Sequence, residues 1–183
     1  MPTSTHARRG FTLTELMITL AIAGILAMIG APAMSHLLAR TQSATAEASI
    51  ANDLRHARTA AIMNNTRVLM CPSTDGHHCR PDDDWQHGWV LARDADHDGQ
   101  PDADAPIIAS QAAMHAGTRV VTSVGREKVV FHPNGSAAGS NARFTICHAR
   151  ERVGKSVIVS NSGRVRLEDA DAVHLQTCLA GIP

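Results

Sequence analysis

The chain has few aromatic residues, with no tyrosine, three phenylalanines and two tryptophans among its 183 residues. Proteins that hold single-stranded nucleic acid without sequence preference usually stack its bases on several aromatic side chains. The composition therefore argues against a base-stacking surface. The formal net charge is zero, which also excludes a uniformly basic chain. We find no internal repeat and no long disordered linker in the sequence.

Charged residues are missing from Leu16–Leu38, where Asp, Glu, Lys and Arg do not occur. A helix over Phe11–Ala31 would be about 30 Å long, which is enough to cross the hydrocarbon core of a bilayer. Glu15 lies near the start of this apolar stretch, where a carboxylate is costly and therefore suggests a function. We expect a transmembrane and assembly helix over residues 11–32, preceded by a basic leader at residues 1–10.

The residues at the head of the apolar stretch have a recognisable order. The leader ends in Arg8-Arg9-Gly10, and Phe11-Thr12-Leu13-Thr14-Glu15 follows. This arrangement resembles the class III signal of type IV pilins and pseudopilins. The resemblance implies that a prepilin peptidase cleaves after Gly10 and that the new N-terminal residue, Phe11, is methylated. In a filament, Glu15 would meet the α-amino group of a neighbouring pilin, so that each neutralises a charge that is expensive in hydrocarbon.

The same resemblance implies a location and a set of partners. The protein would be a single-pass inner-membrane protein with its head in the periplasm, before it joins a pilus or pseudopilus through its N-terminal helix. A Sec signal peptide, with Ala31-Pro32-Ala33 as the cleavage site, is one alternative. It does not explain Glu15 or the length of the apolar stretch. A plain membrane anchor is the other alternative, and it explains the length but not the residues at the head.

Four cysteines are spaced through the second part of the chain, namely Cys71, Cys79, Cys147 and Cys178. An even number in a periplasmic domain indicates two disulfides, with three pairings allowed. Cys71–Cys79 would close a short loop, and Cys147–Cys178 would tie down the C-terminal tail. A zinc site of Cys71, His77, His78 and Cys79 is the alternative, but its spacing matches no common zinc motif. We expect no metal centre.

The pattern after the apolar stretch predicts an amphipathic stem helix over residues 33–65. Its apolar stripe consists of Ile50, Leu54, Ala57 and Ala61, spaced as on one helix face. Short segments rich in β-branched residues follow and predict strands. These are Thr66–Cys71, Trp85–Arg93, Ile107–Ser110, Thr118–Val124, Lys128–Phe131, Arg143–Cys147, Lys155–Ser160 and Arg164–Leu167. The prediction is an α+β fold with a β-rich globular head at residues 66–183 that ends in a C-terminal tail.

Two motifs in the head narrow the resemblance. Trp85-x-x-Gly88-Trp89 precedes an acidic turn, and Gly163-Arg164-Val165-Arg166 lies late in the chain. With the N-terminal signal, they resemble the FimT/GspH family of minor pilins and pseudopilins. The resemblance implies a pilin-like fold, in which a long N-terminal helix packs on a head of antiparallel sheets. It implies no enzyme activity and no cofactor, and we find no set of residues arranged for catalysis.

The late motif is a candidate DNA-binding site. In an extended segment Arg164 and Arg166 point to the same face, and two guanidiniums suit phosphate oxygens. In FimT-like minor pilins a Gly-Arg-x-Arg motif is implicated in binding DNA during natural transformation, and Gly163, Arg164 and Arg166 match it. Further basic residues are candidates to widen the patch, although the sequence alone does not place them on one face: Lys155, Arg150, Arg152 and Arg143. Such a site would bind the phosphate backbone without sequence preference. The alternative is an ordinary solvated hairpin with two surface arginines.

An acidic stretch lies between the two motifs. The segment Asp94-Ala-Asp-His-Asp-Gly99 looks like the start of a calcium loop, with Asp102 further on. An EF-hand loop needs a bidentate Glu at its twelfth position, which is Ala105 here. We therefore expect a solvated acidic turn, with a calcium site as the alternative.

Three functions fit these features. The preferred one is a minor type IV pilin that assembles into a pilus and binds DNA for uptake in natural transformation. The second is a GspH-like minor pseudopilin of a type II secretion system, which has a structural role and does not bind DNA. The third is a minor pilin that only primes filament assembly. All three share the N-terminal signal, so only the Gly163–Arg166 turn separates them.

Overall fold

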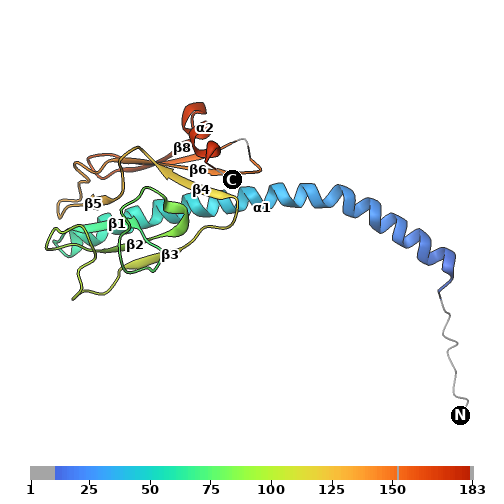
Figure 1. Cartoon of the computed structure of the whole chain (residues 1–183), viewed down its shortest axis with the longest axis horizontal. Helices are drawn as coiled ribbons and strands as arrows, with labels where there is room; N and C mark the ends of the chain where they lie inside the picture. Colours follow the sequence, from blue (N-terminus) through green and yellow to red (C-terminus); the bar gives the residue numbers. More distant parts are fainter. Residues whose placement is uncertain (1–10, 152, 182–183) are drawn as a thin grey trace, which may run out of the picture. The chain divides into compact units, whose positions relative to one another are not determined.

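The computed structural model describes residues 11–151 and 153–181, and the chain divides into two compact units at residues 1–37 and 38–183. The leader, with Gly10, lies outside the described residues. Figure 1 shows a long helix and two sheets. The structure confirms the predicted α+β fold, in which one long N-terminal helix is followed by antiparallel sheets.

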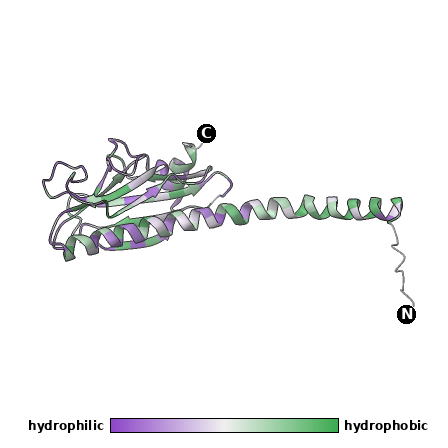
Figure 2. Ribbon diagram, turned by 90° about the horizontal axis from the view of Figure 1, so that it is seen from below, coloured by the Kyte–Doolittle hydropathy of each residue, from purple (hydrophilic) through white to green (hydrophobic). Residues whose placement is uncertain are grey.

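Helix α1 (Leu13–Met63) runs through both units. Its first turn is capped by the Thr12 hydroxyl, which accepts a hydrogen bond from the Glu15 amide at 3.2 Å. All residues of Phe11–Ala31 are exposed. Figure 2 shows that this part of the helix is predominantly hydrophobic. Among the described residues, α1 is long and apolar enough to cross a membrane, as the sequence predicts.

The later part of α1 belongs to the second unit and has a buried stripe. The predicted stripe residues, Ile50, Leu54, Ala57 and Ala61, all have 0% exposure. The helix ends just before Asn65, whose φ of 47° lies in the left-handed region. Asparagine tolerates this conformation better than most residues, so the predicted helix stop is in place.

Eight strands form two antiparallel sheets in the second unit. They are β1 (Val68–Pro72), β2 (Gly88–Arg93), β3 (Ala109–Ala112), β4 (Thr118–Thr122), β5 (Val129–Phe131), β6 (Ala142–His148), β7 (Lys155–Val159) and β8 (Val165–Asp169). The first sheet has the order β3-β2-β1-β5, and the second has the order β4-β6-β7-β8. Each predicted strand corresponds to one of these.

A single hydrophobic core joins α1 to both sheets. Leu54 of α1, Met70 of the first sheet and Phe144 of the second belong to it and are fully buried. Trp89 adds a polar link, because its Nε1 donates a 2.7 Å hydrogen bond to Oδ2 of Asp53 in α1. A buried indole N–H usually has such an acceptor. The core therefore fixes how the two sheets lie around the helix.

The structure adds detail in two places, and in the first of them the prediction was wrong. The segment Trp85–His87, expected to begin a strand, is a 3-10 helix, η1, that turns into β2 at Gly88. The segment expected to be a C-terminal tail contains helix α2 (Ala172–Ala180), whose first turn is capped by the Asp171 carboxylate. The disulfide Cys147–Cys178 joins α2 to β6, and a second disulfide joins Cys71 to Cys79.

Candidate nucleic-acid interface

The hairpin between β7 and β8 presents the late arginine motif. Its turn is closed by a 2.8 Å hydrogen bond from the Gly163 amide to the Ser160 carbonyl. Gly163 has a φ of 76°, and a Cβ placed on it would lie 2.0 Å from the carbonyl oxygen of Gly135. Both the conformation and the close approach of two backbones require glycine. The turn is thus seated on a neighbouring loop and has a defined shape.

The two arginines of the motif are exposed on the outer side of the second sheet. Val165 packs against the core, so its neighbours Arg164 and Arg166 face away from it, as the sequence predicts. Arg166 lies opposite Ile158 of β7. Neither arginine has a carboxylate within ion-pair distance among the described residues. Their two charges are therefore available to a partner.

A third arginine lies on the same face. Arg143 of β6 also pairs with Ile158 in register, so its side chain shares the outer face with Arg166, two strands away. Arg143 Nη1 forms an ion pair with Glu168 of β8. This carboxylate takes up one charge close to the motif. The outer face keeps a surplus of positive charge.

Lys155, expected to widen the patch, is not brought to it. Lys155 lies opposite Asp169 at the other end of the β7–β8 ladder, and its Nζ is 2.7 Å from the Asp169 carboxylate. This hydrogen bond raises the pKa of Lys155. Its position in the strand alternation also matches core residues such as Val157, so it points to the inner face. Lys155 is therefore apart from the arginines and already neutralised.

One cation that was not foreseen lies beneath the turn. Arg58 of α1 donates a 3.0 Å hydrogen bond from Nε to the Gly135 carbonyl, the same oxygen that Gly163 approaches. Its charge has no carboxylate partner among the residues that the structure describes. A helix pattern identifies Arg58 only as polar, because its position under the turn depends on packing between segments far apart in the sequence.

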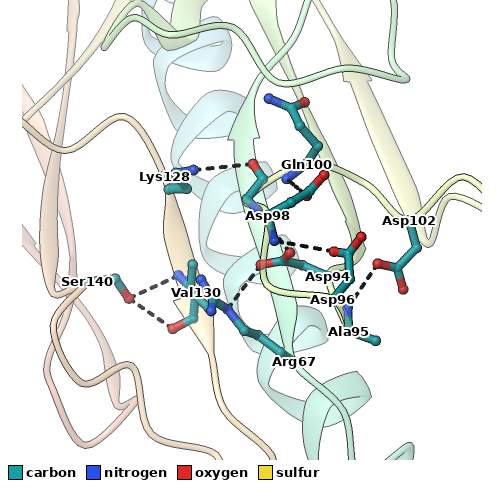
Figure 3. A network of polar contacts seen from close by, with 11 residues as sticks. Arg67, Asp94, Ala95, Asp96, Asp98, Gln100, Asp102, Lys128, Val130 and Ser140 are labelled. Carbon is teal, nitrogen blue, oxygen red and sulfur yellow. Dashed lines mark hydrogen bonds and ion pairs between the residues drawn. The ribbon is translucent and has the colours of Figure 1, made fainter.

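The acidic loop after β2 contrasts with this turn. Figure 3 shows its carboxylates tied into a network of internal contacts. Asp94 is fully buried, and its Oδ2 lies 3.0 Å from Nε of Arg67. The other carboxylate oxygen accepts the Gly99 amide at 3.0 Å. Arg67 and Asp94 form an ion pair without a hydrogen bond, because the Nε–H of Arg67 does not point at the Asp94 oxygen. Charge attraction therefore holds the two side chains together.

A second ion pair holds the far side of the acidic loop. Arg93 binds Asp102 through Nε and Asp104 through Nη2, the latter at 2.9 Å. Hydrogen bonds to Asp102 and then to Asp104 raise the pKa of Arg93. The loop thus carries its own counter-charges.

A metal cation bound in this loop would compete with arginine side chains for the carboxylates. Oxygens of Asp94, Asp96 and Asp102 lie within 4.8 Å of one another, as calcium ligands would. Two of the three carboxylates are already paired with arginines. The turn is not solvated as expected, because Asp94 is fully buried and the Asp102 side chain is 6% exposed. Calcium would have to displace the guanidiniums that hold these two carboxylates.

The residues expected to serve processing and assembly lie at the start of the described chain. Phe11 is 86% exposed, and Glu15 is exposed in the first turn of α1. Gly10 lies outside the part that the structure describes. Their expected roles stay predictions.

Two family models match the chain. The model described as "Type II transport protein GspH" matches residues 46–163, more than half of the chain. The model described as "Prokaryotic N-terminal methylation motif" matches residues 5–31. The two matches together cover the apolar helix and most of the head.

Curated relatives and solved structures agree with these matches. A Pseudomonas aeruginosa protein named "Fimbrial protein" is 43% identical over 63 residues, and the chain spans 40% of its length. "Pilin-like protein PilA1" of Thermus thermophilus is 28% identical over 88% of this chain and 99% of its own length.

The solved structures show the fold alone. The type IV minor pilin FimU of Pseudomonas aeruginosa has a TM-score of 0.57 at 20% identity, covering 70% of this chain and 90% of that one. The minor pseudopilin EpsH of the Vibrio cholerae Type 2 Secretion System has a TM-score of 0.52 at 12% identity, with coverage of 70% and 97%.

Proposed function

The chain belongs to the GspH family of type II transport proteins, and on that premise we propose that it is a minor type IV pilin that binds DNA for natural transformation. The N-terminal methylation motif and the exposed apolar helix support a membrane-anchored subunit that assembles with other pilins. The chain is not an enzyme, because pilins and pseudopilins are structural proteins. The head would lie in the periplasm before assembly.

One observation carries the DNA proposal. Arg164 and Arg166 are exposed on a turn of fixed shape, and no carboxylate among the described residues neutralises them. An exposed arginine without a partner contributes little to folding. Guanidinium forks bind phosphate oxygens well. The turn is therefore suited to the DNA backbone.

The chemistry of the turn predicts how the DNA is bound. Phosphate contacts carry no sequence information and weaken steeply with salt, by roughly 0.9 in the logarithmic slope for each phosphate neutralised. Two arginines per head give weak binding by one subunit. Several heads in one filament would add their contacts, because linked sites bind with avidity.

A DNA shift assay over a salt series tests this function. The full chain in an uncharged detergent is mixed with a short duplex of arbitrary sequence. We expect the double variant R164Q/R166Q to bind at least roughly tenfold more weakly at low salt and to lose about two units of salt slope. R150Q is the matched control, because Arg150 is exposed at the opposite end of β6. Equal binding by R164Q/R166Q and the wild type would overturn the site.

A second function is favoured by the family description. The matching family is named for type II transport, so a structural minor pseudopilin that does not bind DNA is the alternative. Absence of a shift for the wild-type chain at low salt would select it. Both functions use the same anchoring, in which processing after Gly10, methylation of Phe11 and pairing of Glu15 with a neighbouring amine place the subunit in a filament.

A further inference from the structure

A basic cleft lies beside the edge strand β5, separate from the Gly163–Arg166 turn. Its volume is about 310 Å³, and its charged lining residues are Arg67, Arg126, Glu127, Lys128 and His132. We call it the β5 cleft. Arg67, Arg126 and Lys128 are basic and Glu127 is acidic, and Asp94 neutralises Arg67. Arg126 and Lys128 against Glu127 leave the lining with a small surplus of positive charge, which attracts an anion.

Two of the cations keep their charge uncompensated. Arg126 donates hydrogen bonds to the Gly139 carbonyl at 2.8 Å and to Oδ1 of Asn141 at 3.3 Å. Lys128 donates from Nζ to the Gly99 carbonyl at 3.2 Å, as Figure 3 shows. All three acceptors are neutral, and neither cation has an ion pair within the described ranges. Arg67 differs because Asp94 neutralises it.

The backbone of β5 does not offer an edge to a peptide strand at the cleft. The buried Ser140 hydroxyl accepts a hydrogen bond from the Val130 amide and donates one to the Val130 carbonyl, both at 2.9 Å. The free edge at the centre of β5 is thus closed from within the chain. A docking strand would have to displace this bridge. The cleft therefore suits an anionic group better than an added strand.

Arg126, which lines the β5 cleft, lies at the same end of the second sheet as the arginine motif. The end of β4, the start of β6, the end of β7 and the start of β8 meet at one end of the second sheet, because all neighbouring strands are antiparallel. Arg126 binds Asn141 just before β6, and two residues later Arg143 shares the outer face with Arg166. In the strand order β4-β6-β7-β8, Arg143 of β6 thus stands between Arg126, which follows β4, and Arg166 of β8.

We propose that the β5 cleft is a second phosphate-binding site for the DNA backbone, which passes from the Gly163–Arg166 turn across the end of the second sheet to Arg126 and Lys128. This inference rests on the proposed function. Phosphodiesters are the fitting ligand, because the site offers two free cations and no apolar pocket for a base.

The test compares two double variants of the full chain in uncharged detergent, titrated with a fluorescent duplex over a salt series. We expect R126Q/K128Q to weaken binding by roughly tenfold at low salt and to reduce the salt slope by about two. The charge-keeping variant R126K/K128R should retain the salt slope. R55Q/R150Q is the matched control, because both residues are exposed and neither lines the cleft.

Each outcome decides between the two sites. If R126Q/K128Q binds like the wild type while R164Q/R166Q fails, the cleft is overturned and the proposed function stands. If the wild-type chain does not bind duplex at low salt, both are overturned. If R126K/K128R loses as much of the salt slope of DNA binding as R126Q/K128Q does, the weaker binding comes from a change in loop structure. This result would overturn the proposed phosphate site in the cleft.

A separate arm distinguishes DNA from a free anion. Inorganic phosphate is added alone while thermal unfolding of the head is followed. Stabilisation of the wild type that R126Q/K128Q lacks, together with unchanged DNA binding by that variant, would make the cleft a small-anion site and overturn the DNA path. Weakened DNA binding by the variant supports the path.

Discussion

The acidic loop and the Gly163–Arg166 turn are both charged, but their charges are used differently. In the loop, Asp94 is buried against Arg67, and Arg93 holds two further carboxylates. In the turn, Arg164 and Arg166 are exposed without a counter-charge among the described residues. The loop neutralises itself, whereas the charges of the turn have no ion-pair partner in the described part of the chain.

This difference separates charges that are paired within the fold from charges that are exposed to solvent, and the proposed DNA binding rests on the second kind. A buried ion pair is costly to break, because the remaining partner is left uncompensated in a poorly hydrated site. An exposed arginine can be removed at little cost to stability. The number of charged residues in a segment therefore says little about its role. The ion-pair partners of these residues decide the role of the segment.

Removal of Asp94 should have the largest effect on stability. Asp94→Ala leaves the Arg67 guanidinium unpaired and the Gly99 amide without its acceptor. We expect a loss of about 3 kcal/mol in the free energy of unfolding. The measurement is unfolding followed by fluorescence of the two buried tryptophans. Asp104→Ala is the control, because its side chain is 82% exposed, and it should change stability by less than about 0.5 kcal/mol. Equal stability of the two variants would contradict the comparison.

The backbone conformation of the turn should contribute more to the stability of the fold than the charges of its arginines do. Gly163→Ala adds a Cβ at a φ of 76° and 2.0 Å from the Gly135 oxygen. We expect a loss of about 2 kcal/mol in the same unfolding measurement. Gly125→Ala has a similar φ of 74° but no atom within 4 Å of the added Cβ. Gly125→Ala should therefore cost less, about 1 kcal/mol. The reverse order would show that the two loops are not packed as described.

Neutralising the turn should leave the fold intact. R164Q/R166Q removes two charges that have no ion-pair partner in the described chain, so stability should change by less than about 0.5 kcal/mol. Arg67→Gln makes the same chemical change at one position, but it leaves the buried Asp94 carboxylate without its counter-charge. We expect Arg67→Gln to be clearly less stable than R164Q/R166Q in thermal unfolding. A larger loss in the double variant would mean that the turn arginines are structural.

Calcium should have the smallest effect. Asp94 and Asp102, two of the three candidate ligands, are held by arginines. We expect the unfolding temperature of the head to be the same in millimolar calcium and in chelator, since a ligand stabilises only a state that binds it. Arg67→Gln removes the arginine that holds Asp94, so the same comparison of unfolding temperatures with this variant tests calcium binding without that competing ion pair. A rise with calcium in the wild type would restore the calcium site as the correct interpretation.

Much of the fold could be predicted because its signals are local. The stripe Ile50–Ala61 repeats at helical spacing, and the β-branched segments alternate with turn residues. Helix α2 was missed although Asp171 is a standard capping residue, because a short segment near the chain end has little periodicity. The sequence predicts a strand at Trp85–His87, because tryptophan favours strands, whereas the structure has a 3-10 helix there.

The candidate site was predictable only in part. Gly163 and the two arginines form a contiguous motif, and alternation along a strand places both arginines on one face. The sequence also predicts Lys155 as a member of the site. Strand register places it opposite Asp169 instead. Register depends on the turn and on core packing, which a count of basic residues does not contain.

The sequence by itself determined the apolar helix with Glu15 at its head, the helical stripe, the strands and the arginine motif. These follow from chemistry that neighbouring residues carry. Only the tertiary structure decided which charges are free. Asp94 meets Arg67, and Gly163 rests on Gly135, because packing brings together residues that lie far apart in the chain. Arg164 and Arg166 form no ion pair in the described part of the chain, because the nearby Glu168 is held by Arg143.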